Sequence, residues 1–452
     1  MDEAFRQFEI DESRLSSSEK KVLEKLVEAA RLIGPLYLLQ ENNQYPGANF
    51  YPPDATPSEI EEAAKKDPLI LDPYTIVERD KEGDLFAIPY HKKYREYMEP
   101  IARLLEEAAK LSEDRRFSEF LRARAKSFLD DSWDKSETLW LEVGDSKLDI
   151  LIGPIEPYLD NLFSVKCAFQ GNVRIRSEDP KFNPRDYLRV IQNIHASSPM
   201  VSEGAEQSVR VRVDDVVALA GWHARLCPAG TNLPNDPRKV TKYGTKIIIY
   251  TTGIRLREGS ITLKALERVF PSDILKNHPQ ESLLDNAIRA TMLHEITESE
   301  VKYPGSVERL GDMYTPVKEL HASVLGIKSC TFHVLKGILS QQDYEEILMI
   351  FISWLFESWL RVKASKGIMS YLRGYVVAFN FFCEHGGLKV ENGIIKPDFE
   401  KLFVGVDGLS SVLSHLMSSG SQKQAQRFFE QYGSFEIFDE FTPKLKDIPV
   451  DL

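Results

Sequence analysis

The sequence predicts an α+β protein built in two parts. Helical hydrophobic periodicity fills the first 130 residues, changes to strand-like alternation near Glu137, and returns near Ile261. We therefore expect residues 1–215, together with the tail 426–452, to form a part containing helices and strands. Residues 216–425 should form a mainly helical part. A chain of 452 residues is long enough for two or three domains.

Composition excludes several classes of protein. A net charge of −12 gives no electrostatic basis for binding nucleic acid or an anionic membrane. The most apolar segment, Ile347–Trp359, is too short for a membrane span and contains Glu357, so we expect a buried helix. The polar, acidic N-terminus does not resemble a signal peptide. Four dispersed cysteines without a C-x-x-C pair indicate reduced thiols in the cytoplasm and argue against cysteine-held zinc. They are Cys167, Cys227, Cys330 and Cys383.

Four helices are expected in the first 130 residues. A serine-rich cap precedes the periodic segment 16–39. After a loop rich in proline and asparagine (42–57), Thr56-Pro57 starts the next helix, whose early glutamates suit the positive end of the helix dipole. Two further periodic segments cover residues 92–111 and 117–129.

The middle of the chain is predicted to form strands. Segments 137–143 and 148–155 alternate and are rich in branched and aromatic residues, with a polar turn between them. Strand content continues in 162–176 and 247–252. The segment 228–237, PAGTNLPNDP, is expected to be a loop. It is either a plain surface loop or a rigid loop that presents amides to a ligand.

The motif L-H-E-I-T-E-S (293–299) follows an apolar helical run and precedes a stop at 303–305, so we place it on a helix. His294 and Glu298 then share one face, with Glu295 about 100° around the helix axis. Zinc peptidases use this layout, in which two ligands hold the metal and the intervening glutamate acts on bound water. A solvated acidic helix face is the alternative interpretation.

The next helix is expected to begin at Thr315-Pro316, with threonine as the cap and proline in the first position. It carries Glu319 and His321, and His333 follows further along. His321 is either a structural helix residue or a substitute metal ligand. His333 is expected to face the core.

Seven stretches in one order cover nearly the whole chain and carry a family resemblance. They are NFYPPDATPSEIE (49–61), LRARAKSFL (121–129), residues 146–171, residues 228–246, LHEITE (293–298), VKELHASVLG (317–326) and parts of the tail 399–452. Together they resemble the dipeptidyl peptidase III family of zinc peptidases. The resemblance is strongest to its shorter branch, which includes the peptidase-like portion of plant Nudix hydrolase 3 proteins. It implies two lobes, one helical and one built around a β-barrel, with a cleft between them.

The resemblance also implies residue roles at a metal. It makes His294 the first ligand, Glu295 the catalytic carboxylate and Glu319 the third ligand. Glu298 stands where the shorter branch has a second histidine ligand. Ser323 stands where an acidic residue commonly supports the ligands.

On the substrate side, the resemblance matches Glu156 and Tyr158 to residues that bind the peptide's amino end and stabilise the oxyanion. Tyr158 could equally be a buried hydroxyl. Asn232 and Asn235 match a loop that holds the substrate backbone, although their amides could simply stabilise the loop. Two further positions depart from the family pattern. Gln170 replaces a glutamate that helps to capture the substrate ammonium, and Ser365 replaces a histidine used at the transition state.

One imidazole and two carboxylates could hold one divalent metal, either zinc or, with these harder ligands, manganese or magnesium. Without metal, a shared proton would turn the carboxylates into general acid/base groups. Two main functions follow. One is a diverged metal-dependent hydrolase of peptide-like or small-molecule substrates in the cleft, with weak or lost dipeptidyl peptidase activity. The other is a metal-free isomerase, cyclase or lyase of a small metabolite. A ligand-binding pseudoenzyme is a third possible function. In each case we expect a monomer or homodimer.

Overall fold

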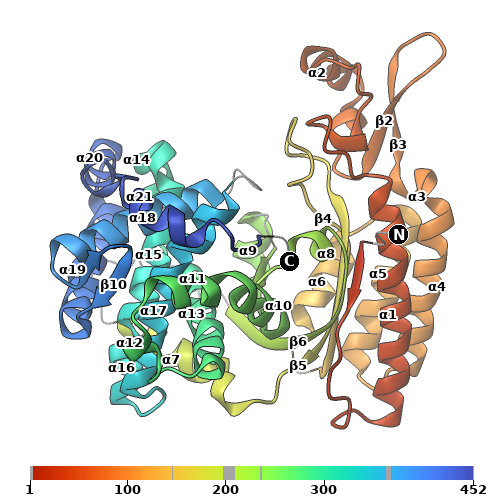
Figure 1. Cartoon of the computed structure of the whole chain (residues 1–452). Helices are drawn as coiled ribbons and strands as arrows, with labels where there is room; N and C mark the ends of the chain where they lie inside the picture. The colour runs from red at the N-terminus through yellow and green to blue at the C-terminus, as the bar shows by residue number, and fades with distance from the viewer. Residues whose placement is uncertain (1–3, 145, 197–208, 235–236, 363–367, 451–452) are drawn as a thin grey trace. The chain divides into compact units, whose positions relative to one another are not determined.

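The computed structural model describes residues 4–144, 146–196, 209–234, 237–362 and 368–450. The chain forms two compact units. The first comprises Met1–Ser177 and Asp214–Pro228, and the second comprises Glu178–Val213 and Ala229–Leu452. Each contains helices and strands, so the predicted α+β class is confirmed (Figure 1).

The first unit combines a helical layer with a sheet. Helix α1 packs on α4, and α4 packs on α5, while α1 also contacts strand β5. Strands β2 and β3 form a separate antiparallel hairpin. The elements are β1 (Phe5–Gln7), α1 (Ser17–Leu38), α2 (Pro57–Lys66), β2 (Thr75–Arg79), β3 (Leu85–Pro89), α3 (Tyr90–Lys93), α4 (Arg95–Leu111), α5 (Arg115–Asp130), α6 (Asp134–Glu142), β4 (Leu148–Glu156), β5 (Ala168–Arg176) and α8 (Trp222–Leu226).

Local sequence signals explain where these helices begin. Ser16 caps α1 by accepting a hydrogen bond from the Glu19 amide, and the Glu19 carboxylate accepts one from the Ser16 amide. This reciprocal capping box satisfies two backbone donors that the helix leaves unpaired. Thr56 caps α2 in the same position, with Pro57 first in the helix, as predicted.

The sheet of the first unit runs through three antiparallel strands. Strand β5 lies between β4 and the end of β6 (Val209–Gly221), and β1 pairs with β6. In this register Gln170 of β5 lies opposite Gly153 of β4 and Gly221 of β6. Both β4 and β5 are buried along nearly their whole length.

The strand predicted for residues 137–143 is wrong, because this segment lies in helix α6. Its buried residues, Ser136, Trp140 and Leu141, are spaced for one face of a helix. Trp140 Nε1 donates to Asp149 Oδ1 of β4 at 3.0 Å, which fixes the helix on the sheet. The segment alternates like a strand over a few residues, but tertiary packing determines that it is a helix.

The second unit is mainly helical. Its elements are α7 (Pro184–Ala196), the start of β6, β7 (Gly230–Leu233), α9 (Pro237–Tyr243), β8 (Thr245–Tyr250), α10 (Thr251–Arg257), a π-helical turn (Glu258–Thr262), α11 (Leu263–Val269), α12 (Ser272–Leu275), α13 (Gln280–Glu300), α14 (Ser306–Leu310), α15 (Tyr314–Lys328), α16 (Cys330–Leu335), α17 (Gln341–Arg361), α18 (Ile368–Glu384), β9 (Leu388–Glu391), β10 (Ile394–Pro397), α19 (Phe399–Ser419), α20 (Gln422–Tyr432) and α21 (Ile437–Leu445).

A central group of helices makes the core of this unit. Helix α13 packs against α15 and α17, and α15 packs against α18 and α19 (Figure 1). Helix α17 is buried from Glu346 to Ser358, as expected for the apolar segment in its middle. Among the described residues, no helix is long and apolar enough to cross a membrane.

Two predicted details of the second unit are wrong. The segment 228–237 is not all loop, because Gly230–Leu233 pairs with β8 as strand β7. The backbone there approaches so closely that a Cβ on Gly230 would lie 2.7 Å from the Ile248 carbonyl oxygen. Helix α15 begins at Tyr314, so Thr315 lies inside its first turn and is not the cap. A 3₁₀ turn, Gly311–Met313, leads directly into it.

The tail does not join the first unit, which corrects the expectation for residues 426–452. Phe441 of α21 packs against Phe356 of α17 and Phe379 of α18, with ring centroids 4.8 and 6.1 Å apart. Phe438 stacks on Trp359 at 4.7 Å. These aromatic contacts bury the tail in the core of the second unit.

Candidate functional site

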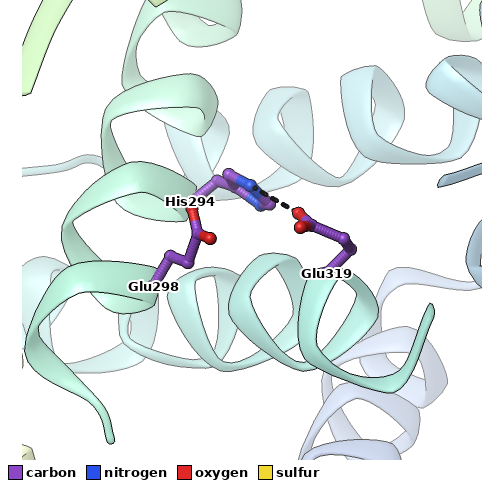
Figure 2. A group of neighbouring side chains, drawn as sticks. All are labelled: His294, Glu298 and Glu319. Carbon is purple, nitrogen blue, oxygen red and sulfur yellow. Dashed lines mark ion pairs between the residues drawn. The ribbon is translucent and has the colours of Figure 1, made fainter. Parts of the chain in front are cut away.

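The structure brings the three predicted metal ligands together in the second unit. Helix α13 places His294 and Glu298 one turn apart, and Glu319 of α15 faces them (Figure 2). One ligand atom from each residue lies within 4.8 Å of the other two. His294 Nε2 and Glu319 Oε2 are 3.5 Å apart. The i, i+4 spacing accounts for the first pair, and the packing of α15 on α13 supplies the third residue.

A glycine permits this close packing. Gly326 of α15 approaches the backbone of α13, where a Cβ would lie 2.9 Å from the Leu293 carbonyl oxygen and 3.3 Å from Thr297 Oγ1. Leu293 precedes His294, so the contact lies beside the cluster. The absence of a side chain at Gly326 therefore lets Glu319 approach His294 and Glu298 on α13.

His294 is oriented by Ser323 of α15. The Ser323 hydroxyl donates to the Glu319 carbonyl at 3.2 Å, so its oxygen can accept a hydrogen bond from His294 Nδ1 at 2.9 Å. This bond directs Nε2 toward Glu319. Ser323 thus occupies the position that holds a metal-ligating imidazole by its far nitrogen.

Lys318 joins the cluster, which the sequence did not indicate. Its Nζ atom lies 2.5 Å from Glu298 Oε1 and 3.0 Å from Glu319 Oε1, so one ammonium bridges both carboxylates. Glu319 Oε2 remains a buried oxygen without a hydrogen-bond partner among the described residues. One oxygen of Glu319 is therefore held by lysine while the other faces His294.

The buried charges shift one another's pKa. Burial alone would lower the pKa of His294, but its interaction with Glu319 and the charge of Glu295 raise it to about 9. Burial would raise the pKa of Glu319, but His294 and Lys318 hold it below its ordinary value. Burial raises the pKa of Glu295 to about 7, and Glu298 adds to the effect. An imidazolium, an ammonium and carboxylates thus stabilise one another here.

The other histidines take structural positions. His321 Nε2 lies 3.3 Å from the Tyr303 hydroxyl and 3.2 Å from Ser414 Oγ, away from the cluster. Burial lowers its pKa to about 4. His333 is buried, and its Nδ1 donates to the Ser329 carbonyl oxygen at 2.7 Å. His321 is thus the structural residue of the two alternatives, and the core position of His333 is confirmed.

The residues matched to substrate binding that the structure describes are divided between the two units. Gln170 is fully buried on β5, and both polar atoms of its amide lack hydrogen-bond partners among the described residues. Glu156 ends β4, and the Tyr158 side chain is 64% exposed. All three belong to the first unit.

Asn232 belongs to the second unit, on β7, where its Nδ2 donates to Ser299 Oγ of α13 at 2.8 Å. This bond ties β7 to the helix that carries His294 and Glu298. Asn235 and Ser365 lie outside the described residues.

The sequence also did not indicate a second residue near the cluster, Tyr371. The ring of Tyr371, on α18, lies 6.5 Å from that of His294 and is 38% exposed. Partial burial and the charges of the nearby carboxylates Glu319, Glu295 and Glu298 raise the pKa of its phenol. The only sequence signal is the i, i+4 pair Tyr371 and Tyr375, which is common in helix packing.

The donor set fits one divalent cation. Zinc accepts imidazole nitrogen and carboxylate oxygen, and Glu319 Oε2 is a buried oxygen that accepts no hydrogen bond among the described residues. Nε2 of His294 faces the same space. His294, Glu298 and Glu319 are the residues that would hold the metal, and two carboxylates would also suit manganese.

A two-unit α+β chain with this pair of helices defines the class of protein: it has the dipeptidyl peptidase III fold. The structure is similar to that of dipeptidyl peptidase III from Caldithrix abyssi, with a TM-score of 0.86 and 22% identity over 98% of this chain and 95% of that one. It is also similar to dipeptidyl peptidase III from Corallococcus sp. strain EGB, with a TM-score of 0.75 and 22% identity over 99% and 94% of the two chains. The resemblance drawn from the sequence is thus confirmed for the fold.

Among curated proteins, the chain is similar to Nudix hydrolase 3 from Arabidopsis thaliana. The two are 23% identical over 447 residues, which cover 90% of this chain and 57% of that protein. The chain therefore spans less than two thirds of the length of this relative. No family model matches the sequence.

Proposed function

We propose that the chain is a diverged metal-dependent hydrolase of peptide-like substrates. The observation that carries this proposal is the convergence of His294, Glu298 and Glu319 within 4.8 Å on a dipeptidyl peptidase III fold. The chemistry supplied by a divalent cation held there would be a more acidic bound water and a polarised carbonyl.

The chain's own residues then have separate tasks. Ser323 holds the His294 ring with Nε2 directed into the cluster. Glu295 follows His294 on α13 and is the carboxylate that would take the proton of the attacking water and return it to the leaving group. Tyr371 lies beside His294 and offers a hydroxyl donor for the developing oxyanion.

Classical dipeptidyl peptidase activity should be weak or absent. Gln170 carries no charge with which to bind a substrate ammonium, and its amide is fully buried. Losing one charge-assisted hydrogen bond costs about 1.5–3 kcal/mol, or at least tenfold in binding. Glu298 also replaces a neutral ligand by an anionic one, which weakens the metal as a Lewis acid. These effects act on different steps and should compound.

One observation favours the alternative of a metal-free isomerase, cyclase or lyase. Lys318 already bridges Glu298 and Glu319, so the carboxylates have a counter-ion of their own. In that case the carboxylates and the ammonium would be the acid/base groups. A ligand-binding pseudoenzyme is the third possibility. For each, the four free cysteines suit a reducing compartment, and we place the protein in the cytoplasm.

Metal analysis and hydrolysis assays on the purified chain test the proposal. We expect near-stoichiometric zinc or manganese after equilibration with metal, and loss of binding in Glu319→Gln. We also expect metal-dependent hydrolysis of some member of a peptide panel that Glu295→Gln abolishes, with little release from dipeptidyl-naphthylamides. Glu281→Gln, an exposed change on the same helix, is the control. A chain that binds no metal, or whose hydrolysis resists chelators, would contradict the proposal.

A further inference from the structure

We infer that Lys318 is a tethered cation that competes with the metal for Glu298 and Glu319 and sets the metal affinity of the site. The inference rests on the proposed metal site and adds a residue that controls its occupancy. Lys318 directly precedes Glu319 on α15, so its side chain is anchored beside the ligands.

The geometry makes Lys318 a counter-ion to both carboxylates at once. Its Nζ atom lies 2.5 Å from Glu298 Oε1 and 3.0 Å from Glu319 Oε1. These residues come from α13 and α15, so the ammonium also links the two helices. The neighbouring Lys302 differs, because its Nζ donates to the Glu298 backbone carbonyl at 2.9 Å instead of the carboxylate.

The two cations cannot share the carboxylates without cost. A divalent metal bound to both carboxylates would lie only a few ångströms from the ammonium, where like charges repel strongly in a partly buried site. Lys318 must then move away from the carboxylates. Its side chain is 28% exposed and flexible, so it can turn toward solvent and admit the metal. Lys318 therefore lowers the affinity without closing the site.

The same bridge should stabilise the metal-free fold. Glu319 is only 8% exposed, and a buried carboxylate without a counter-ion is costly. By neutralising it, Lys318 lets α13 and α15 pack while the site is empty of metal. Removal of the ammonium should thus have two opposite effects, tighter metal binding and a less stable metal-free chain.

Lys318→Met tests both effects on the full chain. Lys328→Met is the matched control, since it lies on the same helix and pairs with Asp407 at 2.6 Å, outside the cluster. Zinc affinity is measured by competition with a chromophoric chelator, and stability by thermal unfolding in chelator. We expect Lys318→Met to bind zinc at least about tenfold more tightly than the wild type, and to melt at a lower temperature without metal. Lys328→Met should retain wild-type zinc affinity.

Zinc affinity of Lys318→Met equal to or weaker than that of the wild type would overturn the inference. So would failure of both chains to bind zinc. Failure of both chains to bind zinc would also contradict the proposed function, whereas two other results separate it from the inference. If the wild type binds zinc through Glu319 and Lys318→Met binds no better, the inference fails and the metal site stands. If only Lys318→Met binds zinc, the inference stands and the unmodified chain is not a metal enzyme.

Discussion

Substitution of Gly326 by alanine tests whether close helix packing builds the site. The added Cβ would lie 2.9 Å from the Leu293 carbonyl oxygen and 3.0 Å from its carbon, both backbone atoms that cannot rotate away. Overpacking of this kind costs about 1–3 kcal/mol. Alanine regains up to about 1 kcal/mol of helix propensity over glycine. We therefore expect a net loss of about 1–2 kcal/mol and displacement of Glu319 from His294.

Thermal unfolding and zinc titration measure these two consequences. A loss of 1–2 kcal/mol should lower the melting temperature by a few degrees. Gly408→Ala on α19 is the control, since a Cβ there meets only Phe381 Cζ at 3.9 Å, an ordinary contact. It should stabilise the chain by about 0.5–1 kcal/mol. Zinc affinity should fall in Gly326→Ala and remain unchanged in Gly408→Ala.

A Gly326→Ala variant as stable as the wild type, with equal zinc affinity, would contradict this prediction. That result would mean that α15 can move away from α13 at no cost. The position of Glu319 would then not depend on the helix contact. A stability loss with unchanged zinc affinity would show that Gly326 permits the close helix packing but that this packing does not position Glu319.

Three further outcomes are expected. Glu298→His should raise zinc affinity, measured by chelator competition, without restoring brisk release of dipeptides; full turnover would show that the other departures do not matter. Arg174→Met should destabilise the chain by about 3–5 kcal/mol in denaturant unfolding, because Asp149 and Asp214 lose a cation with which they are fully buried; a loss under 1 kcal/mol would contradict this. Burial, with a contribution from Arg174, lowers the pKa of His223 to about 3, so only the unfolded chain binds a proton there between about pH 6.5 and 3. The free energy of unfolding should therefore fall as pH drops through this window, by roughly 2 kcal/mol from about pH 6.5 to 5. His223→Asn should remove that part of the pH dependence. Parallel plots of stability against pH for the two chains would exclude His223 as the cause.

Features that depend on neighbours within a few residues could be predicted from the sequence alone. The serine-rich cap at Ser16 and the Thr56-Pro57 start depend on local hydrogen bonds, and both appear where predicted. The i, i+4 spacing of His294 and Glu298 puts both side chains on one face of any helix that contains them. The order of motifs indicated the fold, and the solved structures agree.

Features that depend on partners distant in the sequence became visible only in the folded chain. Segment 137–143 alternates like a strand, but it forms a helix from which Trp140 donates a hydrogen bond to Asp149. The tail joins the second unit because Phe441 packs against aromatic rings on α17 and α18.

The bridging lysine is the clearest case. Lys318 reaches Glu298, twenty positions away along the chain, because Gly326 allows α15 to approach α13. Nothing in the motif VKEL distinguishes a lysine in solvent from one between two carboxylates. The charge state of the site is thus set by helix packing, which local sequence patterns do not encode.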